Sequence, residues 1–142
     1  MLFRSAYERC IADLESGKHG MAFASGMAAT ATILELVESG SNVIAMDDLY
    51  GGTRRLFDGV RKTSAGLEFE FIDLTDLSGC AAAIRDNTRM IWVETPTNPL
   101  LKIVDLAALS DIAKANDILL VDRKSTRLNS SHMSESRMPS SA

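Results

Sequence analysis

Three short segments combine glycine, aromatic and polar residues in patterns that can bind a small charged ligand. In the first, residues 24–30 (ASGMAAT), a short apolar run turns into an alanine-rich stretch. Free backbone N–H groups and the dipole at the start of a helix can hold a phosphate, and Gly26 lets the backbone come close to it. The same turn also suits packing alone, and the segment has neither the lysine of a P-loop nor a G-x-G-x-x-G pattern. These residues by themselves leave both interpretations open.

The second segment, residues 46–53 (MDDLYGGT), places Tyr50 beside two glycines. Glycine neighbours leave room for the ring to lie flat on a planar ligand, although a loop tyrosine can equally pack against the rim of a sheet. Asp47 and Asp48 resemble part of a metal site. Adjacent carboxylates on an extended chain point apart, however, so we expect no metal here.

The third segment, residues 94–99 (ETPTNP), directly follows an apolar run that contains Trp92. Two prolines make the loop rigid, and Asn98 offers both a donor and acceptors to a ligand hydroxyl. A plain surface loop is the alternative, but such a loop seldom needs two prolines and a glutamate at a strand end. We therefore favour a ligand-binding loop, and we expect Trp92 to lie in the core.

The spacing of apolar residues predicts the elements that must position these segments. Helical spacing occurs at residues 6–14, 27–37, 53–60, 77–84 and 105–115. Apolar runs of strand length occur at residues 21–24, 42–46, 68–72, 90–93 and 118–121. Alternating strands and helices, with several continuous apolar runs, predict an α/β fold: a mostly parallel sheet with helices on both faces. Ligands of such sheets bind at the carboxyl ends of the strands, where all three segments fall.

The composition indicates an ordinary soluble protein. The 142 residues are 46% hydrophobic and 24% charged, and the net charge of −4 disfavours nucleic acid as a partner. No apolar run approaches the roughly 20 residues of a membrane span, and we see no signal peptide at the start. We interpret Cys10 and Cys80 as reduced thiols, so we expect a cytoplasmic protein with no membrane partner.

The residues at both ends of the sequence differ from the rest of the chain in their likeness to translated adapter DNA. Residues 122–132 (DRKSTRLNSSH) correspond to the translation of a common sequencing adapter, and residues 2–5 (LFRS) to that of the opposite adapter end. Asp122 itself could be encoded by either source. The interpretation divides the chain into adapter-derived residues 1–5, a natural segment 6–122, and an adapter-derived disordered tail 123–142 with no sheet pairing.

Taken in order, the runs FASGMAAT, MDDLYGGT and ETPTNPLLK resemble the Cys/Met-metabolism family of pyridoxal-phosphate enzymes, close to its cystathionine γ-lyase and γ-synthase branch. The resemblance extends over residues 6–122. It implies that this segment is a fragment of the large domain of a fold type I pyridoxal-phosphate-dependent transferase.

The resemblance also implies roles for individual residues. The backbone amides of Gly26 and Met27 would hold the phosphate of pyridoxal 5′-phosphate. Tyr50 would stack on the pyridine ring and, as a catalytic residue, shuttle protons, while Asn98 would contact the 3′-oxygen. Asp122 would pair with the pyridinium nitrogen, which keeps the ring an electron sink.

Arg55 and Glu94 fall where the family keeps polar groups around the substrate. The implied substrate is a small-molecule amino acid, cystathionine or a relative, acted on at its γ-carbon by elimination or replacement, and the implied assembly is a homotetramer. O-acylhomoserine sulfhydrylase and methionine γ-lyase are alternatives within the family. A non-catalytic phosphate- or nucleotide-binding α/β module is the alternative outside it.

The sequence departs from the family pattern after Asp122. The pattern continues Asp-Asn-Thr-Phe, whereas this chain has Arg123, Lys124 and Ser125 at the next three positions. The family's Schiff-base lysine belongs to a Ser-Ala-Thr-Lys type segment that we do not find in this sequence, and Lys124 is too close to Asp122 to replace it. We therefore expect this chain by itself to be inactive and to bind the cofactor weakly at most.

Overall fold

Four apolar runs of the sequence form the strands of one parallel sheet. The computed structural model describes residues 2–124 of the chain, and its sheet consists of β1 (Asn42–Met46), β2 (Glu68–Ile72), β3 (Thr88–Thr95) and β4 (Leu119–Lys124). The strand order is β2-β1-β3-β4, and every neighbouring pair is parallel. All five residues of β1 are buried, as expected for a central strand covered on both faces.

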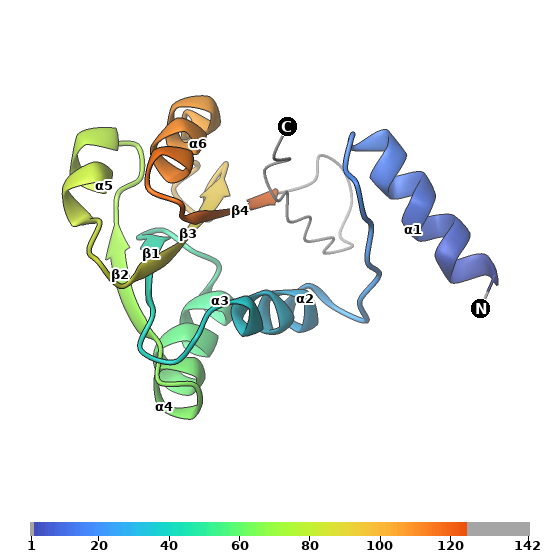
Figure 1. Ribbon diagram of the computed structural model, residues 1–142, viewed down its shortest axis with the longest axis horizontal. Coiled ribbons are helices and arrows are strands. Elements are labelled where there is room, and N and C mark those ends of the chain that lie inside the picture. The colour runs from blue at the N-terminus through green and yellow to red at the C-terminus, as the bar shows by residue number, and fades with distance from the viewer. Residues whose placement is uncertain (1, 125–142) are drawn as a thin grey trace.

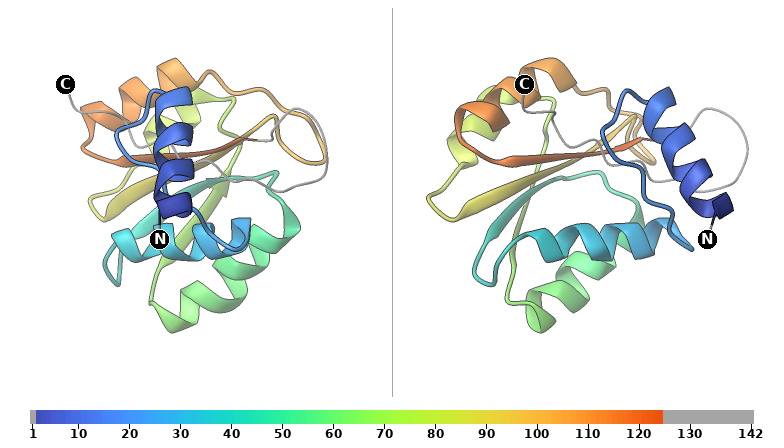
Figure 2. Two further views of the ribbon diagram at one scale, coloured as in Figure 1. Left: turned by 90° about the vertical axis from the view of Figure 1, so that its right-hand side faces the viewer. Right: turned by 45° about the vertical axis from the view of Figure 1, so that its right-hand side comes forward.

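Helices cover both faces of this sheet (Figures 1 and 2). On one face lie α2 (Gly26–Ile33) with its 3-10 extension η1 (Leu34–Leu36), and the continuous helix formed by α3 (Gly51–Arg55), the π-helical turn η2 (Leu56–Arg61) and α4 (Lys62–Ser64). On the other face lie α5 (Leu77–Ala83) and α6 (Leu106–Ala115). The predicted α/β fold is confirmed. The helix predicted at residues 53–60 is longer than expected, because η2 and α4 continue it.

Side chains at the helix starts explain where three of these helices begin. The Ser25 hydroxyl accepts the N–H of Ala28, Asp76 accepts two N–H groups of α5, and Asp105 accepts two of α6. Each cap satisfies backbone donors that have no partner within the helix. The helix predicted at residues 105–115 thus coincides with α6 and its cap Asp105.

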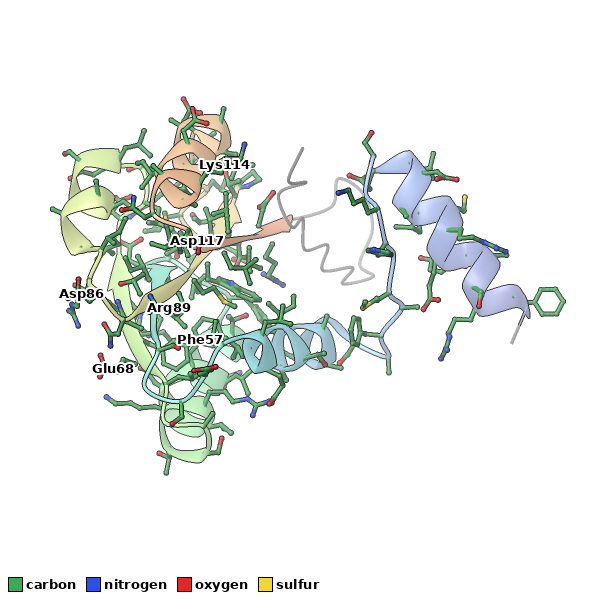
Figure 3. The ribbon with its side chains drawn as sticks, in the orientation of Figure 1. Phe57, Glu68, Asp86, Arg89, Lys114 and Asp117 are labelled. Carbon is green, nitrogen blue, oxygen red and sulfur yellow. The ribbon has the colours of Figure 1, made fainter. Side chains whose placement is uncertain are left out.

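Aromatic side chains fill the core between the sheet and the helix that follows β1. The fully buried Phe57 stacks on Phe69 with ring centroids 4.6 Å apart and meets Trp92 edge to face at 5.4 Å. Figure 3 shows Phe57 between the strands and the helices of that face. Trp92 is 1% exposed, so the prediction that it lies in the core is confirmed.

The first helix, α1 (Leu2–Leu14), stands apart from the sheet (Figure 1). The connecting segment runs back along it: the Ala22 N–H donates to Glu8, and a Cβ on Gly20 would lie 2.2 Å from the Glu8 carbonyl oxygen. The strand predicted at residues 21–24 is therefore wrong: this apolar run lies along α1 and pairs with no strand in the described part of the chain. No helix in the described part of the chain is long and apolar enough to cross a membrane.

The last strand continues past Asp122. Arg123 pairs with Glu94 and Lys124 pairs with Thr95 in the parallel ladder between β3 and β4. The expectation of a disordered tail without sheet pairing is therefore wrong for Arg123 and Lys124. The rest of the predicted tail, residues 125–142, lies outside the described residues.

Candidate functional site

The loop that carries Tyr50 is fastened to the end of β3. The Tyr50 N–H donates to Oε2 of Glu94 at 3.1 Å, and the other oxygen of Glu94 forms an ion pair with Arg123. Glu94 is fully buried. The family resemblance places Glu94 among the polar groups around the substrate. In the structure, both of its carboxylate oxygens bind groups of the protein itself, so Glu94 holds the Tyr50 loop in position.

The Tyr50 ring sits between a glycine turn and a cation. A Cβ on Gly52 would lie 2.4 Å from Cε1 of Tyr50 and 3.3 Å from the sulfur of Met27, so only glycine permits this approach. The Arg123 guanidinium carbon lies 5.1 Å from the ring centroid, within range of a cation–π interaction. Tyr50 is partly buried, which leaves part of its surface for a ligand.

The start of α2 lies beside this tyrosine loop, because Met27 and Tyr50 approach Gly52 together. Ser25 satisfies the Ala28 N–H with its hydroxyl and the Ala29 N–H with its carbonyl oxygen. The N–H groups of Gly26 and Met27 precede these bonds and belong to the first helical turn, which has no intrahelical acceptors. Two backbone donors at a helix start are suited to a phosphate.

Asp122 lies at the same edge of the sheet. It is 5% exposed and stands opposite Val93 in the β3–β4 ladder. Because side chains alternate along a strand, Asp122 lies on the face of the sheet opposite to Glu94. A buried carboxylate at a strand end is a suitable partner for a protonated ring nitrogen.

Asn98 is exposed on the loop between β3 and α6. This loop is tied to the tyrosine loop, since the Leu100 N–H donates to Oδ2 of Asp48 at 2.8 Å. Arg55 is exposed at the end of α3, and its guanidinium folds back to lie 3.4 Å from the position of a Cβ on Gly51. The seven predicted site residues thus lie on segments at the carboxyl edge, with Asn98 and Arg55 at its surface.

Sequence reasoning missed a three-way ion pair at this edge. Nζ of Lys102 lies 2.9 Å from Oδ2 of Asp47 and 2.8 Å from Oδ2 of Asp73. The hydrogen bond from Lys102, together with those from Thr75, lowers the pKa of Asp73 from 3.8 to about 2. The sequence does indicate where these charges lie. Asp47 and Asp73 are each the first residue after a predicted strand, and Lys102 ends the ETPTNPLLK run that follows another predicted strand.

A shallow hollow opens at the other end of the sheet, where the strands begin. Figure 3 labels two of its charged residues, Arg89 and Asp117. The lining residues are Leu36, Val37, Glu38, Ser41, Arg89, Asp117, Ile118 and Leu119. This hollow is remote from the glycine turn and the tyrosine loop, so we do not assign the ligand to it.

A helix start, an aromatic loop and a buried carboxylate lie along the carboxyl edge of the parallel sheet. This arrangement places the chain in the class of open α/β proteins, whose ligands generally bind at the strand ends. The model of the Cys/Met metabolism PLP-dependent enzyme family matches residues 2–124, and the chain belongs to this family. The family and its cofactor, pyridoxal phosphate, are thereby confirmed. The match includes residues that we assigned to adapter, and that assignment stays a prediction.

Individual relatives agree with the family. The chain is 62% identical over 118 residues to a cystathionine beta-lyase of Coxiella burnetii, covering 83% of this chain and 30% of that protein. It is 49% identical over 115 residues to a probable cystathionine gamma-synthase of Herpetosiphon aurantiacus, covering 81% and 36%. The crystal structure of cystathionine gamma-lyase from Lactobacillus plantarum complexed with L-serine superposes with a TM-score of 0.82 at 47% identity, covering 84% and 31%. The chain spans about a third of the length of these relatives.

Proposed function

We propose that the protein to which this chain belongs is a pyridoxal-phosphate-dependent trans-sulfuration enzyme that acts on the γ-carbon of cystathionine or a related sulfur amino acid. The observation that carries the proposal is the approach of Met27 and Tyr50 to Gly52. It brings a helix start that is suited to a phosphate and an aromatic ring together at the edge where parallel α/β sheets bind ligands.

The residues at this edge fit the cofactor. The N–H groups of Gly26 and Met27 would hold the phosphate, and the face of Tyr50 would lie on the ring. Asn98 would donate to the 3′-oxygen, and the buried carboxylate of Asp122 would pair with the ring nitrogen. Once bound, the cofactor would supply an electron sink for negative charge that develops on the substrate.

The remaining work falls to side chains of this chain. Asp122 would hold a proton on the ring nitrogen, and the Tyr50 hydroxyl would move a proton at the substrate. Glu94 supports this by fixing the Tyr50 backbone. Arg55 is an exposed cation that follows the tyrosine loop, and it would attract an anionic group of the substrate.

The names of the relatives bear on two aspects of the reaction: the position at which the substrate is cleaved and the identity of the substrate. The relative at 62% identity is named a beta-lyase, which adds β-elimination to the γ-elimination and γ-replacement expected from the sequence. Cystathionine stands in the names of the relatives described above, which favours it over the substrates of O-acylhomoserine sulfhydrylase or methionine γ-lyase.

We also propose that the whole protein is a cytoplasmic homotetramer. The free thiols of Cys10 and Cys80 support a reducing compartment. The exposed side chains of Leu100, Leu101 and Ile103, each more than 60% accessible, support contacts with further protein that the described residues do not make. Sedimentation velocity of the full-length protein tests the assembly.

The test of function uses the complete reading frame, expressed with pyridoxal phosphate and assayed with cystathionine. Release of 2-oxobutanoate with cysteine indicates γ-elimination, whereas pyruvate with homocysteine indicates β-elimination. A Tyr50→Phe variant should keep cofactor binding and lose most turnover, because it retains the ring and lacks the hydroxyl. A protein that binds phosphate compounds but does not act on cystathionine or a related sulfur amino acid would instead be the non-catalytic phosphate- or nucleotide-binding module.

The 142-residue chain provides the complementary measurement. We expect it to be inactive toward cystathionine and to release pyridoxal phosphate on dialysis. A visible absorbance band that survives dialysis, or turnover above that of free cofactor, would contradict this expectation.

A further inference from the structure

Lys102 connects three strand ends that are separate in the sequence. Asp47 follows β1, Asp73 follows β2, and Lys102 lies on the connection between β3 and α6. The ammonium nitrogen reaches both oxygens of Asp47 at 2.9 and 3.0 Å and Oδ2 of Asp73 at 2.8 Å. We call this arrangement the Lys102 bridge.

The backbone around the bridge is held by a second set of hydrogen bonds. The Lys102 N–H donates to the Thr97 hydroxyl at 2.8 Å, and the Thr97 N–H donates to the Lys102 carbonyl at 3.1 Å. These bonds close a short loop that carries Asn98. The Leu100 N–H, from the same loop, donates to Asp48. An ion pair and a hydrogen bond from a backbone N–H to a carboxylate therefore join the asparagine loop to the tyrosine loop.

The exposure of the charged groups indicates what the bridge can contribute. The side chain of Lys102 is 22% exposed, while those of Asp47 and Asp73 are 39% and 42% exposed. Ion pairs with this much solvent contact add little to global stability. One lysine with three donors that engages two carboxylates does, however, define the relative position of the loops that carry them.

We propose that Lys102 is a positioning residue that holds the Asn98 loop against the Tyr50 loop at the carboxyl edge of the sheet. That these loops contact the cofactor rests on the proposed function. The positioning of one loop against the other by Lys102 does not depend on that function. Without the ammonium group, Asp47 and Asp73 would face each other as like charges, and the Leu100–Asp48 bond would remain to connect the two loops.

Backbone amide hydrogen exchange of the 142-residue chain, followed by NMR, tests the proposal. In Lys102→Met we expect the Leu100 and Tyr50 amides to exchange about fivefold faster, the change that loss of about 1 kcal/mol of local interaction gives. The amides of Ile44 and Ile91 in the central strands should keep their rates, because a positioning role does not affect the core. Lys102→Arg keeps the charge and should restore most of the protection.

The matched control is Lys114→Met, which removes an exposed lysine on α6 (Figure 3) and should leave all four amides unchanged. Unchanged exchange at Leu100 and Tyr50 in Lys102→Met, or an equal increase at Ile44 and Ile91, would overturn the proposal. If Lys102→Met does not fold, Asp73→Asn weakens one arm of the bridge and should give a smaller increase confined to the same loop amides.

A separate arm of the experiment distinguishes this proposal from the proposed function. Pyridoxal phosphate is added to the wild-type chain while the amide signals of Gly26, Tyr50 and Asn98 are recorded. Shifts at these residues support the cofactor site. Because we expect this chain to bind the cofactor weakly at most, the result that counts against the cofactor site is a full-length protein that gives no visible absorbance band with pyridoxal phosphate. The role of Lys102 is decided by the exchange rates in either case.

Discussion

The backbone N–H of Tyr50 and the carboxylate of Glu94 lie 3.1 Å apart across 44 residues of sequence. This bond fixes the loop after β1 to the end of β3, so the position of the tyrosine loop depends on a buried residue of another strand. The carboxylate is fully buried and also holds Arg123, so its loss would leave two donors unsatisfied.

Replacing Glu94 by alanine should therefore lower the free energy of unfolding by about 2–4 kcal/mol, because it leaves a partly buried guanidinium and a backbone N–H without an acceptor. Urea denaturation measures the change. The control is Glu68→Ala, which removes a carboxylate that is 56% exposed and should cost less than about 1 kcal/mol. Equal losses in the two variants would contradict the supporting role of Glu94.

Replacing Gly52 by alanine should displace the Tyr50 ring, because the added methyl group would lie 2.4 Å from Cε1 of that ring. We expect a change in the NMR signals of the Tyr50 ring and weaker binding of pyridoxal phosphate by the full-length protein. Gly59→Ala is the control, since no atom beyond its chain neighbours and the backbone of its own helix lies within 4 Å of the new Cβ. That variant should gain about 0.5–1 kcal/mol of stability and leave the ring signals in place.

Replacing Phe57 by alanine should reduce the free energy of unfolding by about 3–5 kcal/mol, since it opens a cavity between Phe69 and Trp92. Trp92 is the only tryptophan of the chain, so its fluorescence should shift to longer wavelength as the cavity admits water. Phe3→Ala removes a ring that is 93% exposed and should change stability by no more than about 0.5 kcal/mol. A small effect in Phe57→Ala would place the core elsewhere.

The Lys102 bridge predicts a particular pH dependence. The folded-state pKa of Asp73 is about 2, below its ordinary value of 3.8, so its contribution to stability is present above pH 3.8 and is lost as the pH falls through about 2. The hydrogen bond to Asp73 and that to Asp47 raise the pKa of Lys102, so the lysine contribution is fully present below pH 10.5. Carboxyl carbon NMR should find the Asp73 titration near pH 2 in the wild type and closer to 3.8 in Lys102→Met. An unchanged titration would show that Lys102 does not act on Asp73.

The elements that could be predicted from the sequence are those with a continuous buried run. The strand at residues 42–46 coincides with β1, because its residues face helices on both sides and are therefore apolar throughout most of their length. Strand β3 (Thr88–Thr95) is longer than the strand predicted at residues 90–93. Its added ends include Thr88, Glu94 and Thr95, polar residues that give no apolar signal although they pair in the sheet.

The site could be predicted in outline because strand ends at one edge of a parallel sheet meet, whatever their separation in sequence. That rule predicts that Tyr50, Asn98 and Asp122 lie at one edge of the sheet. It could not supply the partner of each group, which depends on register and loop conformation. The family resemblance implies that Glu94 is one of the polar groups around the substrate, and only the paths of β1 and β3 reveal that it accepts the Tyr50 N–H.

The Lys102 bridge also has a consequence for the nascent chain. Synthesis delivers Asp47 and Asp73 first, and Lys102 leaves the ribosome 29 residues after Asp73. Asp47 precedes Lys102 by 55 residues. At about 5–20 residues per second, Asp73 therefore spends roughly 1.5 to 6 seconds, and Asp47 roughly 3 to 11 seconds, without the shared cation. During that time β1 and β2 have already been synthesised and each is followed by an unneutralised aspartate. A ribosome that pauses before residue 102 would prolong this state, and translation speed through the β3–α6 connection would then govern when the tyrosine loop is secured.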